Sequence, residues 1–180
     1  MRIIAGGLKG RRLKAPSWDG LRPTSDKLRE TLFNILGGRV PGARVLDGYA
    51  GTGAVGLEAL SRGARAVTFV ERDRRAVALI EANLAACDVR EGYTIACGEV
   101  VVALLRMPDD AAFDLILLDP PYDIVDEGGL LTAAAGRLAP DGLLVLERAT
   151  RREPDVPAAL VRVRDVRSGD STLTFLTRHS

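Results

Sequence analysis

The strongest constraint on the fold is a regular alternation of short apolar runs with helical patterns between residues 44 and 148. The apolar runs are hydrophobic at nearly every position rather than at every second one. Such runs are typical of parallel strands that are covered by helices on both faces. The expected strands are residues 44–47, 66–71, 93–97, 113–119 and 142–148, and the expected helices are 53–62, 74–86, 101–107 and 128–138.

Two segments outside this alternation complete the predicted fold. Residues 159–178 form two runs around a Ser-Gly-Asp turn, which predicts an antiparallel hairpin. Residues 2–16 read as a short glycine-interrupted hairpin, and residues 24–36 carry the apolar spacing of a helix. We therefore expect an α/β protein with a doubly wound, Rossmann-like sheet and an antiparallel C-terminal hairpin. The predicted organisation is a basic extension over residues 1–40 and a main domain over 41–180.

The residue content excludes several kinds of chemistry. The chain of 180 residues has one histidine, His179, next to its end, so a histidine base or a histidine-rich metal site is not expected. Two cysteines build neither a disulfide framework nor a zinc site. There is no apolar run of about 20 residues for a membrane span. We expect a cytoplasmic monomer without a metal ion or a membrane contact.

Charge is distributed unevenly along the chain. Residues 1–44 contain ten Lys and Arg against three Asp and Glu, which gives +7, whereas the remaining residues carry −6. A basic arm on an acidic body suggests that the arm meets a polyanion, although a solvated charged face would have the same composition. The basic residues of the first predicted hairpin are Lys9, Arg11, Arg12 and Lys14.

A glycine-rich loop follows the first predicted strand in "VLDGYAGTGAVGLEAL". Gly51, Gly53 and Gly56 fit the dinucleotide pattern G-x-G-x-x-G, and Glu71 ends the second strand, where it could bond a ribose. Asp47, however, closes the first strand, and a carboxylate suits an ammonium group better than a phosphate. The loop therefore resembles motif I of class I methyltransferases, which bind S-adenosylmethionine. A dinucleotide site and a purely structural turn remain alternatives.

Ten residues are expected to bind this donor, because they form the loop, the ends of the neighbouring strands and the start of the next turn. Glu99 lies just past the third strand, near the expected adenine, but an exposed acid at a helix start would look the same. The expected donor-binding residues are Asp47, Tyr49, Ala50, Gly51, Thr52, Gly53, Glu71, Arg72, Glu99 and Asp119.

The fourth strand ends in the rigid sequence Asp119-Pro120-Pro121-Tyr122. Ligands of open α/β sheets bind at the carboxyl ends of the strands, so this corner is expected beside the glycine loop. Asp119 and the carbonyl of Pro120 could accept hydrogen bonds from an amine, Pro121 would stiffen the turn, and Tyr122 could stack on a base. This motif resembles that of methyltransferases acting on adenine N6, guanine N2 or glutamine amide nitrogen, and the four residues alone do not choose among them.

Four stretches together narrow the assignment: "RIIAGGLKGRRL", "LRPTSDKLRETLFNIL", "DGYAGTGAVGLEALSRGA" and "LLDPPYD". They are similar to the RsmD family of bacterial 16S rRNA guanine-N2 methyltransferases. The resemblance implies S-adenosylmethionine as the methyl donor and 16S rRNA in the small ribosomal subunit as the partner. It adds Arg22, Arg29 and Asn34 to the substrate-binding set of Lys9, Arg11, Arg12, Lys14 and Tyr122. The helix face of Arg29, Glu30, Phe33 and Asn34 is expected to cover the donor pocket.

The sequence departs from the family at three positions. Gly48 replaces a larger residue, Tyr49 a common Phe, and Ser168 an aromatic residue before the last turn, which leaves contacts from that turn open. Two other functions share the same motifs. A DNA adenine-N6 methyltransferase would need a target-recognition domain for which the chain leaves no room, and a non-catalytic rRNA-binding assembly factor would keep the fold without the reaction. A nicotinamide oxidoreductase is more distant still.

Overall fold

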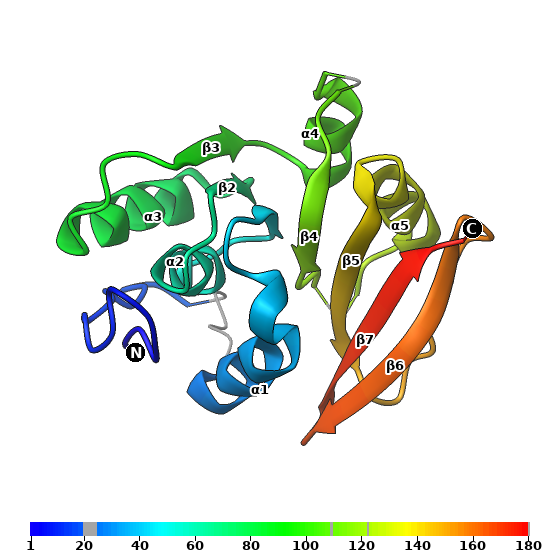
Figure 1. The fold of residues 1–180 in the computed structure, drawn as a ribbon, viewed down its shortest axis with the longest axis horizontal. Coiled ribbons are helices and arrows are strands. Elements are labelled where there is room, and N and C mark those ends of the chain that lie inside the picture. The colour runs from blue at the N-terminus through cyan, green and yellow to red at the C-terminus, as the bar shows by residue number, and fades with distance from the viewer. Residues whose placement is uncertain (20–24, 109, 122, 180) are drawn as a thin grey trace.

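The computed structural model describes residues 1–19, 25–108, 110–121 and 123–179. A seven-stranded sheet runs through the molecule in the order β3-β2-β1-β4-β5-β7-β6 (Figure 1). The first five strands are parallel, and β7 and β6 are antiparallel. The predicted doubly wound sheet with an antiparallel C-terminal hairpin is therefore confirmed. The strands are β1 (Arg44–Gly48), β2 (Ala66–Glu71), β3 (Tyr93–Cys97), β4 (Phe113–Leu118), β5 (Leu138–Ala149), β6 (Leu160–Ser168) and β7 (Ser171–Arg178).

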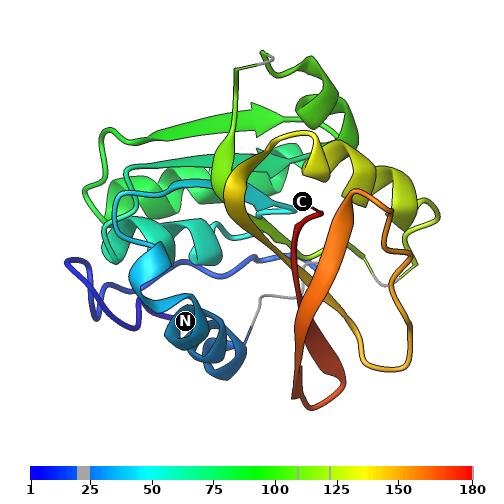
Figure 2. The ribbon, with the colours of Figure 1, turned by 45° about the vertical axis from the view of Figure 1, so that its right-hand side comes forward.

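Helices cover both faces of the sheet (Figure 2). Successive residues of a strand point to opposite faces, so Val45 of β1 joins the core under α1, α2 and α3, while Leu46 joins the core under α4 and α5. This two-sided burial explains why the strands are apolar at nearly every position. The helices are α1 (Asp26–Leu36), α2 (Ala54–Ser61), α3 (Arg74–Ala86), α4 (Val100–Arg106) and α5 (Glu127–Ala135), with a 3-10 turn η1 (Gly37–Arg39).

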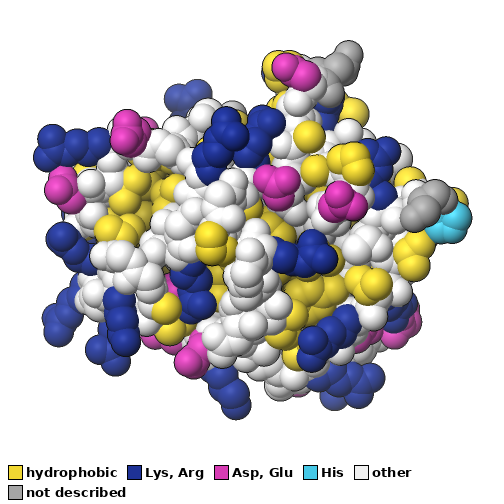
Figure 3. Space-filling model, viewed as in Figure 1, with side chains coloured by type: hydrophobic (Ala, Val, Ile, Leu, Met, Phe, Trp, Pro, Cys, Tyr) yellow, Lys and Arg dark blue, Asp and Glu magenta, His cyan; other side chains and the backbone are white. Residues whose placement is uncertain are grey.

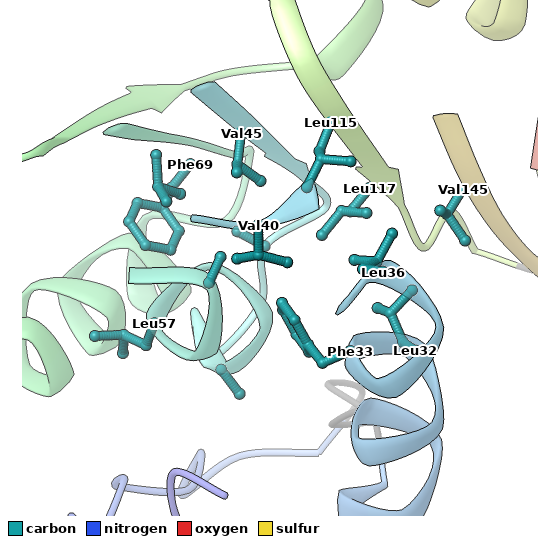
Figure 4. Packing of buried hydrophobic residues seen from close by; sticks show 14 of the residues in the cluster. Leu32, Phe33, Leu36, Val40, Val45, Leu57, Phe69, Leu115, Leu117 and Val145 are labelled. Atoms are coloured by element: carbon teal, nitrogen blue, oxygen red, sulfur yellow. The ribbon is translucent and has the colours of Figure 1, made fainter. Parts of the chain in front are cut away.

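Helix α1 closes one face of the sheet. Ser25 caps its start by accepting a hydrogen bond from the amide of Leu28 at 3.1 Å. Leu32 and Leu36 then point towards Leu117 of β4 and Val145 of β5 (Figure 4). Burying each such side chain stabilises the fold by roughly 1.5–3 kcal/mol. The packing holds α1 across the carboxyl ends of β4 and β5.

The N-terminal segment forms a short, irregular hairpin. Its one bridge pairs Arg2 with Arg12, and the amide of Ile3 donates to the carbonyl of Arg11 at 3.0 Å. Ile3 and Leu13 are buried in the same core as α1, α2 and α3. The predicted extension therefore packs into the core of the main domain instead of forming one of its own. No helix among the described residues has the length and apolar character needed to cross a membrane.

Candidate active site

The loops after β1, β2, β4 and β5 meet at one edge of the sheet. Gly48 at the end of β1 is level with Val70 of β2 and Leu118 of β4. Strands β2 and β3 lie on one side of β1, and β4 and β5 lie on the other. The strand order therefore reverses at β1, and open α/β sheets bind ligands at such a reversal. The glycine loop and the Asp119 turn, far apart in sequence, are thus neighbours in space.

The glycine loop is held in shape by backbone hydrogen bonds. Gly53 has a φ of +76° as the N-cap of α2, and its amide donates to the carbonyl of Ala50 at 2.7 Å. Gly51 has a φ of +56°, and its amide donates to a carboxylate oxygen of Glu71 at 2.9 Å. Gly56 permits close packing, since a Cβ there would lie 2.2 Å from the ring of Phe69. Glycine supplies these conformations and approaches without steric cost.

Asp47 is buried beneath the loop. Its Oδ2 accepts a hydrogen bond from the amide of Gly56 at 2.8 Å. The pKa of Asp47 is raised from 3.8 to about 8, chiefly by burial and further by the charges of Asp119 and Glu71, while the hydrogen bond from Gly56 opposes the shift. A carboxyl group with this pKa is largely protonated at neutral pH. A cationic group placed beside it would favour the charged carboxylate.

Glu71 and its neighbours connect the glycine loop to the loop that follows β2. The carboxylate of Glu71 accepts from the amides of Gly51 and Asp73, each at 2.9 Å, so it links the ends of two loops. Arg72 and Glu99 form an exposed ion pair at 3.2 Å. Burial of Tyr49, with the charge of Glu99 as the second cause, raises the tyrosine pKa to about 12.

A cavity of about 520 Å³ opens at this edge, a size typical of small-ligand sites. It joins the glycine loop, the ends of β2, β4 and β5, the start of α1 and the turn between β6 and β7. Asp119 and Pro120 lie on one wall, and the amide of Asp119 donates to the carbonyl of Gly48 at 3.4 Å. The lining residues are Ser25, Leu28, Tyr49–Thr52, Ala54, Val55, Glu71–Asp73, Asp119–Pro121, Glu147 and Ser168–Ser171.

Most of the expected donor residues line this cavity. Asp47 instead lines a smaller adjoining cavity of about 30 Å³, together with Asp119. Gly53 is the N-cap of α2 and does not line the larger cavity. Glu99 does not line it either. Arg22 and Tyr122 lie outside the described residues.

The basic residues of the N-terminal hairpin point to the exterior. Lys9, Arg11, Arg12 and Lys14 are all exposed. Figure 3 shows Lys and Arg side chains along the side of the molecule where the N-terminal segment lies in Figure 1. Asn83 of α3 fixes the end of this hairpin: its Oδ1 accepts from the amide of Lys14, and its Nδ2 donates to the carbonyl of Thr52 at 2.9 Å. The hairpin and the glycine loop therefore share one anchor.

The structure departs from the expectation that Arg29 binds substrate. Arg29 is fully buried, lies 3.6 Å from the carboxylate of Glu58, and donates to the carbonyl of Arg2 at 2.6 Å. A buried guanidinium needs carboxylate partners, and Arg29 has two: Asp26 of its own helix at 3.0 Å and Glu58 on α2. Arg29 thus ties α1 to the N-terminal segment.

The face of α1 that was expected to cover the donor pocket does not line the cavity. Glu30 and Asn34 are exposed, and Phe33 is buried in the core. Leu28 and the capping Ser25 line the cavity instead. The turn of α1 that reaches the sheet edge is its first one, which the apolar stripe alone did not specify.

The sequence-based prediction did not include three features that the structure shows. Glu147 lines both cavities, and the turn of residues 168–171 closes the larger one. Glu58 holds the N-terminal segment by accepting from the amides of Ile4 and Ala5 at 2.8 and 3.0 Å. A signal for Glu147 was present, since it is an acid near the carboxyl end of a strand, as are Asp47 and Asp119.

Comparison with known proteins identifies the family. A family model described as "Conserved hypothetical protein 95" matches residues 1–177. Ribosomal RNA small subunit methyltransferase D of Haemophilus influenzae is 35% identical over 150 residues, covering 82% of this chain and 78% of that protein. The chain belongs to the ribosomal RNA small subunit methyltransferase D family. The predicted resemblance to the RsmD family is therefore confirmed.

Two further relatives support this placement. The putative rRNA methyltransferase YlbH of Bacillus subtilis is 37% identical over 160 residues, covering 87% of this chain and 86% of that protein. A solved structure, the putative methyltransferase yhhF from Escherichia coli, superposes with a TM-score of 0.87 at 32% identity and covers 99% of this chain and 97% of that one. The predicted class I methyltransferase fold and the assignment as a methyltransferase are confirmed.

Proposed function

We propose that this protein transfers a methyl group from S-adenosylmethionine to the exocyclic N2 of a guanine in 16S rRNA of the small ribosomal subunit. One observation carries the proposal: the acid-led, proline-stiffened turn at Asp119 opens into the same cavity as the glycine loop. The relatives named as rRNA methyltransferases support rRNA as the substrate. Such a substrate would place the protein in the cytoplasm.

The donor half of the cavity fits S-adenosylmethionine through its charge. The molecule carries an ammonium group and no phosphate, and it supplies an activated methyl group on a sulfonium. Asp47 would hold the cationic amino acid end, and Glu71 would bond the ribose hydroxyls at the end of β2. Asp47 lies beside the glycine loop, where a carboxylate would repel a pyrophosphate, which disfavours a dinucleotide.

The acceptor half fits an amine on a flat base. The lone pair of such an amine is delocalised into the ring, so the amine is a weak nucleophile. The carboxylate of Asp119 and the carbonyl of Pro120 would accept its two hydrogens and favour a pyramidal nitrogen that aims its lone pair at the methyl group. Asp119 would also stabilise the positive charge that develops there. Most of the rate enhancement would come from holding the two reactants in line.

The exposed basic hairpin supports an RNA partner. Lys9, Arg11, Arg12 and Lys14 would contact phosphates, an interaction that is independent of base sequence and sensitive to salt. Asn83 joins this hairpin to the glycine loop, so phosphate contacts would position the target base relative to the donor.

The test is transfer of labelled methyl from S-adenosylmethionine to small subunits that lack the modification, with naked 16S rRNA and DNA in parallel. Nucleoside mass spectrometry then identifies the product. We expect N2-methylguanosine from the subunits. N6-methyladenine in DNA would contradict the proposed target, and donor binding without transfer to any substrate would contradict the activity and favour an assembly factor.

A further inference from the structure

We infer that Glu147 selects guanine, by accepting the N1–H of the base beside the amine that Asp119 holds. The inference rests on the proposed guanine-N2 activity and names the residue that gives it specificity. It begins from the position of Glu147, the one acidic residue that lines both cavities together with Asp119.

The register of two parallel strands brings these acids together. Leu118 of β4 is level with Leu146 of β5. Asp119 directly follows the end of β4 and Glu147 is the next residue of β5, so the two acids stand beside each other where strands about 4.8 Å apart reach the cavity. Both line the large cavity that the glycine loop also lines.

A neighbouring strand fixes the carboxylate of Glu147. Ser171, the first residue of β7, is buried, and its hydroxyl donates to Oε1 of Glu147 at 3.0 Å. Ser171 directly follows the turn that closes the cavity, so the same hairpin positions the acid and covers it. A carboxylate offers about four acceptor positions, and the bond from Ser171 uses one of them.

Guanine presents two adjacent donors on its Watson–Crick edge, the N1–H and the N2 amino group. Two carboxylates side by side match that edge, and an enzyme that takes a base out of its helix can recognise it there. Adenine presents an amine beside an unprotonated N1. A carboxylate facing that nitrogen would place two acceptors against each other, which disfavours adenine. Asp119 would therefore act on the amine and Glu147 on the neighbouring N1–H.

The experiment changes both the acid and the base. The methylated guanine is located by mass spectrometry, and small subunits are then prepared with guanine or 2-aminopurine at that position. 2-Aminopurine keeps the 2-amino group but has an N1 that accepts rather than donates. Wild type and Glu147→Gln are compared by kcat/KM on both substrates and by calorimetry for the donor Kd. Glu91→Gln, an exposed acid at the other end of the sheet, is the matched control.

We expect Glu147→Gln to lower kcat/KM on guanine by about 10- to 100-fold, the range expected for losing one good base contact. The preference for guanine over 2-aminopurine should narrow by a similar factor, because a glutamine amide can donate to the unprotonated N1. Donor Kd should stay within about twofold, and Glu91→Gln should match wild type. Ser171→Ala, which removes the bond that positions the carboxylate but keeps the carboxylate, should narrow the preference in the same direction by about 10-fold, the lower end of what a hydrogen bond to a charged group contributes.

Two results would overturn the inference in distinguishable ways. If Glu147→Gln and Ser171→Ala leave the preference between the bases unchanged while wild type makes N2-methylguanosine, Glu147 does not select the base and the proposed function stands. If wild type makes no N2-methylguanosine, the proposed function fails and the inference falls with it.

Discussion

The two halves of the cavity are built differently. In the donor half, the backbone amides of Gly51 and Gly56 donate to the buried carboxyl groups of Glu71 and Asp47. In the acceptor half, the ends of β4 and β5 and the β6–β7 turn bring side chains together from three separate segments of the chain. The donor loop is thus fixed by hydrogen bonds from its own backbone amides, whereas the acceptor wall depends on the pairing of separate strands.

This difference has a functional consequence. A loop fixed by its own hydrogen bonds is ready to bind the donor before any substrate arrives. The acceptor wall includes the exposed Pro121 and the exposed turn residues Gly169 and Asp170, so it is accessible to a macromolecule. A substitution in the donor half is therefore expected to leave acceptor binding largely intact, and the reverse is expected for the acceptor half. Four predictions test this independence of the two halves.

The largest effect is expected at Asp119. Replacing Asp119 by Ala removes the acceptor that orients the amine and stabilises its developing charge, so kcat should fall by about 10³-fold or more. Donor Kd, measured by calorimetry, should change by only a few-fold, and the melting temperature should stay near that of wild type. Near-normal turnover would remove Asp119 from the mechanism.

A second prediction concerns the packing of the donor half. In Gly56→Ala the new Cβ would lie 2.2 Å from the ring of Phe69, so the free energy of unfolding should fall by about 1–3 kcal/mol. Donor binding should weaken because α2 carries the glycine loop. Gly98→Ala is the control, since nothing lies within 4 Å of its added Cβ. Urea unfolding that cannot distinguish the two variants would contradict this account of the loop.

The basic hairpin should affect the acceptor and not the donor. Replacing Arg11 and Arg12 together by Ala should raise KM for the small subunit by about tenfold and flatten the dependence of binding on salt by about one unit of slope for each lost phosphate contact. Donor Kd should stay unchanged. Arg106→Ala, an exposed arginine at the end of α4, controls for lost charge. An unchanged salt slope in the double variant would rule out these phosphate contacts.

The smallest effect concerns the protonation of Asp47. Its pKa is about 8 in the fold against an ordinary 3.8, so the free energy of unfolding that it contributes is greatest below pH 3.8 and is lost as pH rises through 8. A bound ammonium favours the carboxylate. Donor binding at pH 7 should therefore release up to about one proton, and donor Kd should fall between pH 6 and 8.

Calorimetry in two buffers of different ionisation enthalpy measures that proton. Asp47→Asn keeps an oxygen that can accept from the amide of Gly56 but cannot ionise. The variant should bind the donor more weakly, without the pH dependence. Equal proton release by wild type and Asp47→Asn would show that another group titrates.

The donor half could be predicted from sequence because its determinants are local. An acid at the end of a strand, a glycine loop and a helix start occur within ten residues, and their pattern indicates a ligand site. The Asp119 turn could be predicted for the same reason. The sheet could also be predicted, because two-sided burial leaves strands apolar at nearly every position.

The rest depends on pairings that no local pattern encodes. The approach of Glu147 to Asp119 needs the register of β4 with β5, and its bond with Ser171 needs the pairing of β5 with β7. Arg29 shows the opposite difficulty. The family resemblance implied a role in substrate binding, but the carboxylates of Asp26 and Glu58 allow Arg29 to be buried.

The separation of the two halves can be measured directly by hydrogen exchange with and without S-adenosylhomocysteine, the product form of the donor. We predict added protection in the glycine loop, residues 49–54, and at residues 72–74, and unchanged exchange in the β6–β7 turn, residues 168–171. Protection concentrated in that turn, with none in the glycine loop, would contradict the assignment of the two halves.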